Sequence, residues 1–350
     1  MAHFPPPPLT NMFRVNINAL FRIIKESVMK MDSSIMNKEG IEKLLTMLPS
    51  EEDISRIEEA QEQTPELPLG TAEQFLLTLS SISGLEARLR LWAFKLDFVA
   101  LEAEICEPLG DLKQGLDVLK SSVTFNAILS VILDIGNFLN GTASKGFSID
   151  YLAKVPEVKD TVHKHSLLYH LTFWLLETIP SLSDLYSEIG AVTRASKTDF
   201  EELASTLMRM EEECKSAWDY LKIINKFDVS HGEGEGGMKN KISEFLVDAA
   251  ERIIVMQKVN KIMRKQFQDF LVWLGVPKSQ THEHKVSHVF KTISEFALEF
   301  RTSRERAQQT LKFKREAKER NRSRAKLHEL VKNSSKSELN MLLSDVDAPR

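Results

Sequence analysis

The residues whose types and spacing could support binding chemistry lie between Gly136 and Gly141, in the run Gly-Asn-Phe-Leu-Asn-Gly. Asn137 and Asn140 are three positions apart, so in a helix their carboxamides share one face. Carboxamides could bind the backbone of a segment laid across that face, or could instead cap their own helix end. Gly136 would cost about 1 kcal/mol relative to alanine in a helix, which predicts close packing there. Gly141 is placed to end the helix in a left-handed turn.

A nucleotide site is the first alternative chemistry, because the segment Gly232 to Gly237 matches the spacing G-x-G-x-x-G. A dinucleotide site needs a preceding strand and a helix N-terminus free of opposing charge. Here the segment lies between two helical patterns, and Glu233 and Glu235 would repel phosphate. We therefore interpret it as a flexible turn and expect no nucleotide cofactor.

A metal site is the second alternative, because His284 and His288 are one helical turn apart and His282 lies nearby. No cysteine accompanies them, and histidines at exposed helix starts are more common than zinc sites. The sequence also shows no serine elbow, no catalytic pairing of cysteine with histidine and no phosphate loop ending in Lys-Ser or Lys-Thr. We expect neither an enzyme nor a metal or cofactor.

Charge is distributed unevenly along the chain. The net charge is −4, yet residues 301–332 hold twelve Lys or Arg and four Glu, so this segment carries +8 and the remainder −12. A basic end on an acidic body predicts an acidic polymeric partner, although a solvated helix face is the plainer alternative. The basic residues proposed for this role are Arg301, Arg304, Arg306, Lys312, Lys314, Arg315, Lys318, Arg320, Arg322, Arg324 and Lys326. Phe313 is the single aromatic residue in the segment, so a base-stacking platform, and with it nucleic acid as a partner, is not expected.

Composition is that of a helical protein from a reducing compartment. Apolar residues make up 42% of the 350 residues and charged residues 27%, while 14 Gly and 12 Pro are few enough to favour long helices. The two cysteines are far apart in helical patterns, so no disulfide is required and a cytoplasmic location is expected. No leader and no apolar run near 18 residues is evident, so we expect neither secretion nor a membrane span.

The predicted elements are almost all helices. Apolar spacing of three and four residues predicts helices over 14–31, 41–48, 71–80 and 84–106, a bend at Pro108, a helix resuming to Lys120, and a helix ending near Asn140 whose apolar face includes Leu139. A further helix is predicted from Asp160 to Thr178. Two long helices over 196–226 and 238–274 carry heptad-like seams and should form an antiparallel hairpin. A last helix over 285–329 should leave the core beyond Arg301, followed by a disordered stretch over 333–350.

The Gly136–Gly141 run is part of a longer pattern, since Gly146-Phe147 and then Tyr151-Leu-Ala-Lys154 follow it. This order resembles the signature of the formin homology 2 domain. Five further stretches are similar to those of an FHOD-type formin, and they lie at 30–45, 91–96, 166–171, 184–189 and 293–300. Several separate motifs in one order are much more specific than any one of them.

The resemblance implies an all-α, elongated core made of a knob, a coiled-coil hairpin and a post, with a long C-terminal helix. It assigns residues 15–330 to the domain, 1–14 to a flexible proline-containing start, 301–332 to a basic helical extension and 333–350 to a disordered tail. It also implies a head-to-tail dimer that encircles the barbed end of an actin filament, nucleates filaments and remains on the growing end.

Particular residues acquire roles through the same resemblance. Ile17 and Lys154 match the two positions that carry most of the actin contact in the family; alternatively, Ile17 lies on a buried helix face and Lys154 is a solvated surface lysine. Gly136, Asn137, Asn140 and Gly141 match the socket that receives an N-terminal segment of the partner subunit. A basic tail after the domain often adds filament binding in formins, which favours actin over nucleic acid for residues 301–332.

The chain departs from the family pattern at its start. Residues 1–14 contain no tryptophan, whereas the family has an aromatic-bearing lasso and a linker before the knob. We therefore expect the lasso and linker to be missing and a closed homodimer to be in doubt. Pro5 to Pro8 form too short a run to predict profilin as a partner.

Three functions remain open at this point. The first is an actin-binding formin core that binds filament barbed ends and regulates nucleation or elongation, weakened by loss of the lasso. The second is a helical structural protein that bundles filaments or competes with full-length formin without nucleating. The third is binding of nucleic acid or microtubules through the basic helix alone, which should be strongly salt-dependent.

Overall fold

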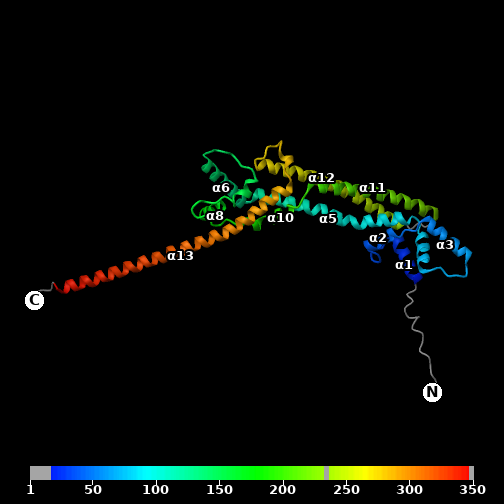
Figure 1. The fold of residues 1–350 in the computed structure, drawn as a ribbon, viewed down its shortest axis with the longest axis horizontal. Coiled ribbons are helices and arrows are strands. Elements are labelled where there is room, and N and C mark those ends of the chain that lie inside the picture. Colours follow the sequence, from blue (N-terminus) through cyan, green and yellow to red (C-terminus); the bar gives the residue numbers. More distant parts are fainter. Residues whose placement is uncertain (1–16, 232–235, 347–350) are drawn as a thin grey trace, which may run out of the picture. The chain divides into compact units, whose positions relative to one another are not determined.

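The computed structural model describes residues 17–231 and 236–346, and within them every regular element is a helix (Figure 1). The all-α class predicted from the sequence is therefore confirmed. The helices are α1 (Ile17–Lys30), α2 (Lys38–Thr46), α3 (Glu51–Gln63), α4 (Thr71–Ser80), α5 (Leu85–Ser121), α6 (Val123–Asn140), α7 (Tyr151–Lys154), α8 (Leu167–Thr178), α9 (Leu185–Glu188), α10 (Gly190–Ala195), α11 (Phe200–His231), α12 (Gly236–Trp273), the 3-10 helix η2 (Thr281–Glu283) and α13 (Val286–Val346).

The chain forms two compact units, each made of two segments. Unit 1 comprises residues 1–109 and 200–262, and unit 2 comprises residues 110–199 and 263–350. The long helices α5 and α12 each contribute to both units. The units are described one at a time below.

Unit 1 contains a small helical cluster at its start, built from α1 to α4. The packing of these four helices buries the side chains of Val28, Ile41 and Leu79 completely. Local capping sets the helix starts: Asn37 accepts a hydrogen bond from the backbone N–H of Gly40, as expected for an N-cap residue. Ser50 is the N-cap of α3, because its hydroxyl accepts the Asp53 N–H at 3.1 Å.

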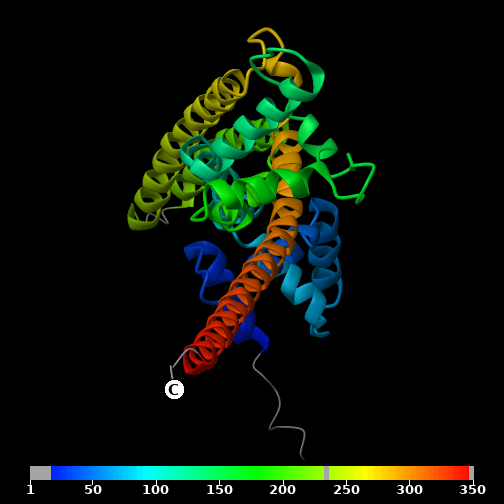
Figure 2. The same cartoon turned by 90° about the vertical axis from the view of Figure 1, so that its left-hand side faces the viewer.

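The two long helices of unit 1 form the predicted hairpin. They lie side by side in two views (Figures 1 and 2), and Gln257 of α12 donates to Glu211 of α11 at 2.8 Å. Their buried seam consists of Leu203, Leu207, Met210, Cys214, Ala217, Leu221, Ile224, Ile242, Leu246, Ala249, Ile253 and Met256. A third helix that the heptad pattern could not reveal joins them: Arg252 of α12 pairs with Glu102 of α5 and lies 5.0 Å from the Phe98 ring.

The predicted bend at Pro108 is wrong, because α5 continues through it as one helix. Proline in a helix interior removes one backbone hydrogen bond and costs about 3 kcal/mol. Burial offsets this cost, since Ile105, Leu109 and Leu112 around the proline are all fully or almost fully buried. Tertiary packing has overridden the local preference here.

Unit 2 is organised around the first half of α13, which contacts α7, α8, α9 and α10. Phe290, Ile293 and Phe300 are completely buried. Close backbone approach occurs at Gly115 of α5, where an added Cβ would lie 3.1 Å from the Phe290 ring and 3.3 Å from the Val192 side chain. The packing glycine of this unit is therefore Gly115, which sequence reasoning did not single out.

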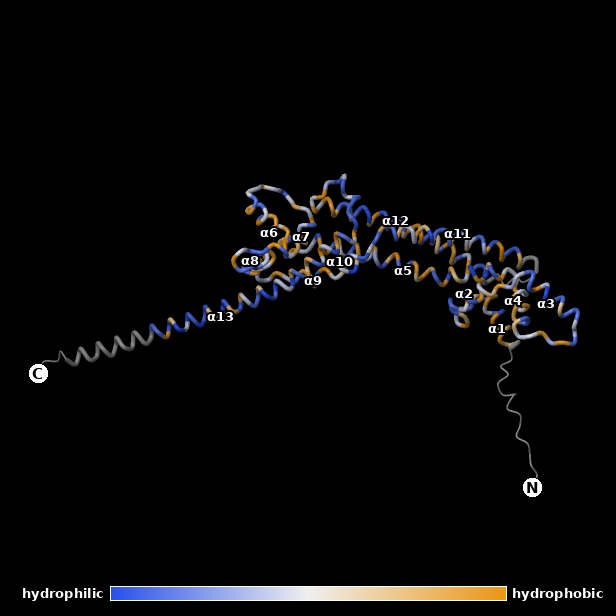
Figure 3. Tube along the Cα trace, viewed as in Figure 1, coloured by the Kyte–Doolittle hydropathy of each residue, from blue (hydrophilic) through white to orange (hydrophobic). Residues whose placement is uncertain are grey.

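Two predicted boundaries in unit 2 are wrong. The helix expected from Asp160 starts at Leu167, because Ser166 caps it by accepting the Tyr169 N–H at 3.1 Å. The last helix does not leave the core at Arg301: Ser303 and Ala307 are still buried, and the helix is fully exposed only from Ala317. Figure 3 shows the hydrophilic character of this exposed stretch.

The segment 333–350 was expected to be disordered, yet α13 runs to Val346. The stretch from Asn333 to Val346 contains no glycine or proline, and it includes strong helix formers such as Glu338, Leu339 and Met341. Residues 347–350 lie outside the described residues, as do residues 1–16, on which the expectations of a flexible start and a missing lasso rest.

Among the described helices, α6 alone is long and apolar enough to cross a membrane, by length and composition only. This differs from the sequence-based prediction of no membrane span, which rested on the absence of an apolar run near 18 residues. One face of α6 packs inside unit 2, where Phe125, Ile128 and Ile132 are buried and the helix lies against α8, while its C-terminal end is exposed.

Candidate functional site

The candidate site lies in unit 2, at the C-terminal end of α6 and in the segment that follows it to α7. The other end of α6 is fixed firmly. Ser122 caps the helix by accepting the Phe125 N–H at 3.0 Å, and its hydroxyl donates to Glu188 at 2.6 Å. Thr124 donates to the same carboxylate at 3.0 Å. The helix therefore presents its C-terminal end from a rigid base.

The helix ends where the sequence predicted, in a left-handed turn. Gly141 has φ 60° and ψ 33°, a conformation that glycine adopts without steric cost. The N–H of Thr142 donates to the carbonyl of Asn137 at 3.0 Å, and the N–H of Gly141 donates to the carbonyl of Phe138 at 3.4 Å. These two bonds are those of a Schellman motif, which satisfies carbonyls at a helix end.

The two asparagines of the signature have different environments. Asn137 binds the loop of its own chain: its Oδ1 accepts the Ser144 N–H at 2.9 Å and the Thr142 hydroxyl at 3.2 Å, and its Nδ2 donates to the Ser144 carbonyl at 2.9 Å. Asn140 is exposed, and its carboxamide has no hydrogen-bond partner among the described residues. The local capping alternative therefore holds for Asn137, while Asn140 is available to another molecule.

The surface around these asparagines is open and apolar. Phe138 and Leu139 are 86% and 66% exposed, although the sequence pattern had assigned Leu139 to the buried face. A Cβ added at Gly136 would meet nothing within 4 Å, so no described residue provides the close packing predicted for this glycine. An exposed phenylalanine beside an open glycine is a typical surface for binding another protein segment.

A hollow of about 450 Å³ lies in the same unit, between the loop after α6 and the turn that precedes α13. Its apolar lining includes Phe147, Ile149, Val276 and Pro277. The Phe147 ring is fixed by an edge contact with Tyr151, at 6.0 Å between ring centroids. A hollow of this volume and lining suits one large apolar or aromatic side chain.

Lys154 is the last residue of α7, and its position is fixed by its neighbours. Leu152 and Val155 are completely buried, whereas Lys154 is exposed and its ammonium pairs with no described residue. Asp150, just before α7, accepts a hydrogen bond from His288 at 2.8 Å. This bond holds the pKa of Asp150 below its ordinary value.

The histidines considered for a metal do not form a cluster. His284 precedes α13 and His288 lies inside it, so the two are not on one helical turn, and His288 instead bonds Asp150. Across residues 17–231 and 236–346, no three His, Cys, Asp or Glu side chains are grouped to hold a metal ion.

The basic residues of α13 divide into two groups. Arg301 faces Asp184 at 3.7 Å, Arg304 donates to the Leu182 carbonyl at 2.9 Å, and Lys314 lies 4.4 Å from the Phe173 ring. These three stabilise the packing of α13 on unit 2. The other basic residues predicted to bind filaments are exposed, and they are Arg306, Lys312, Arg315, Lys318, Arg320, Arg322, Arg324 and Lys326. Ile17 begins α1, but its side chain lies outside the described residues.

Comparison with known proteins identifies the family. A model of the Formin Homology 2 Domain matches residues 7–301. The chain belongs to this family. It is 51% identical over 306 residues to FH1/FH2 domain-containing protein 3 of Mus musculus, covering 87% of this chain and 19% of the relative. It is 42% identical over 323 residues to FH1/FH2 domain-containing protein 1 of Homo sapiens, covering 92% of this chain and 27% of that protein.

More distant formins match as well. Protein diaphanous of Drosophila melanogaster is 25% identical over 250 residues, which cover 70% of this chain and 22% of the relative. The resemblance to FHOD-type formins inferred from the separate motifs is thus confirmed. The chain spans only about a fifth to a quarter of the length of these relatives.

Proposed function

We propose that this formin domain binds actin and regulates the assembly of filaments at their barbed ends, with Lys154 as a direct contact. Family membership supports this proposal, and so does the environment of Lys154. An unpaired ammonium on a turn anchored by two buried side chains is pre-positioned for an acidic protein surface. Ile17 at the start of α1 is the second proposed contact.

We also propose that the end of α6 receives a segment of a second copy of the chain. Phe138, Leu139 and the open face at Gly136 would contact that segment, and the hollow beside Phe147 would accept one of its large apolar side chains. Asn140 would hydrogen-bond its backbone. In this arrangement Asn137 acts indirectly, because its carboxamide shapes the loop of its own chain.

Actin assembly followed by pyrene fluorescence tests the first proposal. Lys154→Glu should reduce the effect of the domain on assembly about tenfold or more, because charge reversal adds repulsion to the lost attraction. Lys113→Glu is the matched control, since Lys113 is an exposed lysine of the same unit without an ion-pair partner among the described residues. Equal assembly rates for the Lys154 variant and the control would refute the assigned contact.

Sedimentation equilibrium of the purified chain tests the second proposal. If this chain supplies such a segment to a second copy despite its short start, it will form dimers, and Phe138→Asp will shift it towards monomer without lowering its thermal stability. Val123→Asp is the control, because Val123 is 74% exposed at the opposite end of the same helix. A chain that is monomeric at every concentration would contradict the dimer contact but leave the Lys154 test intact.

Filament bundling is the second candidate function, favoured by the eight exposed basic residues that α13 presents from Arg306 to Lys326. Low-speed pelleting of filaments distinguishes it from regulation at barbed ends. If bundling is the function, the Lys154 variant will bundle normally, whereas replacing Arg320, Arg322 and Arg324 with Gln will abolish the pelleting.

A further inference from the structure

A second cleft in unit 2 has a different chemistry from the hollow beside Phe147. It has a volume of about 490 Å³ and lies between the loop that precedes α8 and the buried half of α13. Its lining includes the cationic side chains of Lys159, Lys164 and Arg306, the hydroxyl-bearing Ser303 and Thr310, and Glu299. Three cations therefore line this cleft, with Glu299 as the single carboxylate.

These cations have no internal partner. The side chains of Lys159, Lys164 and Arg306 are exposed, and none of them forms an ion pair or a side-chain hydrogen bond within the described part of the chain. Lys159 and Lys164 belong to the loop before α8 and Arg306 belongs to α13, so cations from two separate elements line one cleft. Unpaired cations gathered in one concavity raise the local concentration of anions.

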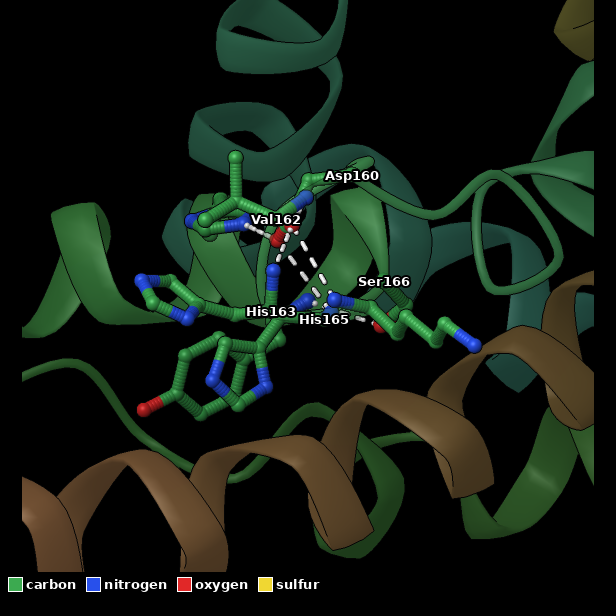
Figure 4. Close-up of polar contacts among 8 residues, drawn as sticks. Asp160, Val162, His163, His165 and Ser166 are labelled. Atoms are coloured by element: carbon green, nitrogen blue, oxygen red, sulfur yellow. Dashed lines mark hydrogen bonds and ion pairs between the residues drawn. The ribbon is translucent and has the colours of Figure 1, made fainter.

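The loop that carries two of the cations is held rigidly by Asp160 (Figure 4). The Oδ1 of Asp160 accepts the N–H groups of Val162, His163 and Lys164, at 2.9, 2.6 and 3.1 Å. Its Oδ2 accepts the His165 N–H at 3.2 Å and bonds the His170 ring at 2.8 Å. Both carboxylate oxygens of Asp160 thus form hydrogen bonds within its own chain.

Further contacts fix the loop relative to α13. An antiparallel bridge pairs Lys159 with Ser166, and Lys164 adopts a left-handed backbone with φ 54°. The ring of His165 stacks on Tyr169 at 4.4 Å, and the Tyr169 hydroxyl donates to Thr310 of α13 at 3.2 Å. The two walls of the cleft are therefore joined, and the backbone positions of the cationic residues are set before any ligand binds.

A buried hydroxyl without a partner provides an independent observation. Ser303 lines the cleft, is only 8% exposed, and its Oγ makes no hydrogen bond. The neighbouring hydroxyls of Thr302 and Thr310 are satisfied by helix carbonyls. Buried polar atoms are nearly always hydrogen-bonded, so the Ser303 hydroxyl remains free to donate to a ligand that reaches it.

We propose that this cleft binds a small organic phosphate carrying at least two phosphate groups, of the inositol phosphate kind. Arg306 would bind one phosphate through two parallel hydrogen bonds, as guanidinium groups do. Lys159 and Lys164 would neutralise a second phosphate from the opposite wall, and Ser303 would donate its hydroxyl. The volume exceeds that of a single phosphate ion and leaves room for the organic part. The same chemistry exists in a soluble ligand and in a lipid headgroup.

Isothermal titration calorimetry of the full chain with inositol 1,4,5-trisphosphate tests the proposal. Binding should weaken as salt is added, and Arg306→Gln or Lys164→Gln should each reduce the affinity about tenfold. Glu299→Gln should tighten binding several-fold. Arg315→Gln, which changes an exposed arginine of the same helix outside the cleft, should leave the affinity unchanged.

Ser303→Ala separates a binding role from a structural one. Because the hydroxyl has no partner in the folded chain, its removal should leave the melting temperature unchanged or raise it. The affinity for the trisphosphate should nevertheless fall several-fold. A lower melting temperature with unchanged affinity would assign the hydroxyl to folding and overturn its proposed role.

Flotation with vesicles containing phosphatidylinositol 4,5-bisphosphate identifies the source of the ligand. Binding to the vesicles alone, abolished by Arg306→Gln, would assign the cleft to a lipid headgroup; binding to both probes would assign it to the phosphate group itself. Binding of neither probe, or equal losses in the Arg306 and Arg315 variants, would overturn the proposal. Binding of polyglutamate in place of both probes would overturn it in favour of an acidic peptide.

Discussion

Two loops of unit 2 are each held by one polar side chain, and they differ in the kind of surface that they leave open to other molecules. Asn137 holds the loop after α6 with three hydrogen bonds to Thr142 and Ser144. Asp160 holds the loop before α8 with four backbone N–H groups and the His170 ring. The first side chain is neutral and the second is charged.

The difference lies in what each loop leaves open. Around Asn137 the chain exposes Phe138 and Leu139 and leaves space over Gly136, so apolar surface remains without a partner. Around Asp160 the backbone N–H groups of residues 162–165 are satisfied, the rings of His165 and Tyr169 stack, and the rings of Tyr169 and His170 meet edge to face. The loop after α6 leaves its apolar side chains exposed, so they can contact another molecule. The loop before α8 has a fully hydrogen-bonded backbone turn, so it serves as a rigid wall of the cationic cleft.

The largest effect is expected at Asp160. Asp160→Asn removes the charge and leaves the bonds from His165 N–H and His170 without their acceptor, so the loop should lose order. Hydrogen exchange at residues 162–165 should accelerate strongly and the melting temperature of the domain should fall. Asp150→Asn, which also breaks a bond to one histidine but serves no backbone N–H from a turn, should have a much smaller effect. Similar losses in both variants would show that the Asp160 network is not special.

Lowering the pH should reproduce the loss of thermal stability expected for Asp160→Asn. The hydrogen bond from His170 and those from the backbone of His163, Val162 and His165 hold the pKa of Asp160 far below its ordinary value. A group whose pKa is lowered on folding contributes stability above its unfolded pKa, about 3.9 for aspartate, and loses it as the pH falls further. Below about pH 4 the melting temperature of the natural chain should therefore approach that of Asp160→Asn. Parallel curves at all pH values would contradict this assignment.

A smaller effect is expected at Asn137. Asn137→Ala removes three hydrogen bonds at a partly exposed site, so chemical denaturation should show a loss of about 1–2 kcal/mol. Because the loop then no longer fixes the Phe147 hollow, dimer formation should weaken as well. Asn140→Ala is the control for stability, since its carboxamide has no partner in the chain; a loss as large as that for Asn137 would refute the distinction between the two amides.

The two smallest effects on stability are expected at Gly141 and Gly136, and they have opposite signs. Gly141→Ala should destabilise the domain by about 1 kcal/mol, because its backbone is left-handed. Gly136→Ala should stabilise it by up to about 1 kcal/mol, because the position is helical and an added Cβ meets nothing. Denaturation curves measure both. If Gly136→Ala also weakens dimerisation, the open face is used by a partner; unchanged dimerisation would argue against that use.

The sequence predicted the class, the helix end at Gly141 and the hairpin, because each depends on local signals: apolar periodicity, a capping residue or a glycine turn. It could not predict the role of Gly115 or the continuity of α5 through Pro108. Both follow from burial against segments distant in the chain. Local propensity is too weak, at a few kcal/mol, to decide such positions.

The candidate site was predictable only in part. The Gly-Asn pattern located it, yet the periodicity placed Leu139 in the core, since an apolar residue in phase with a buried face looks the same whether or not another helix covers it. Asp160 was read as part of a helix because a side chain that accepts four backbone N–H groups leaves no periodic signal. The cationic cleft was missed because Lys159, Lys164 and Arg306 come together only when α13 packs on the loop.

The exposed part of α13 also sets a length. From Ala317 to Val346 a helix rising about 1.5 Å per residue extends ~45 Å, and from Ala317 to Glu329 every side chain is exposed. A solvated single helix behaves as a semi-rigid spacer. In a longer formin, a segment attached beyond this helix would be held away from unit 2, and the length of the helix would set the distance between that segment and unit 2.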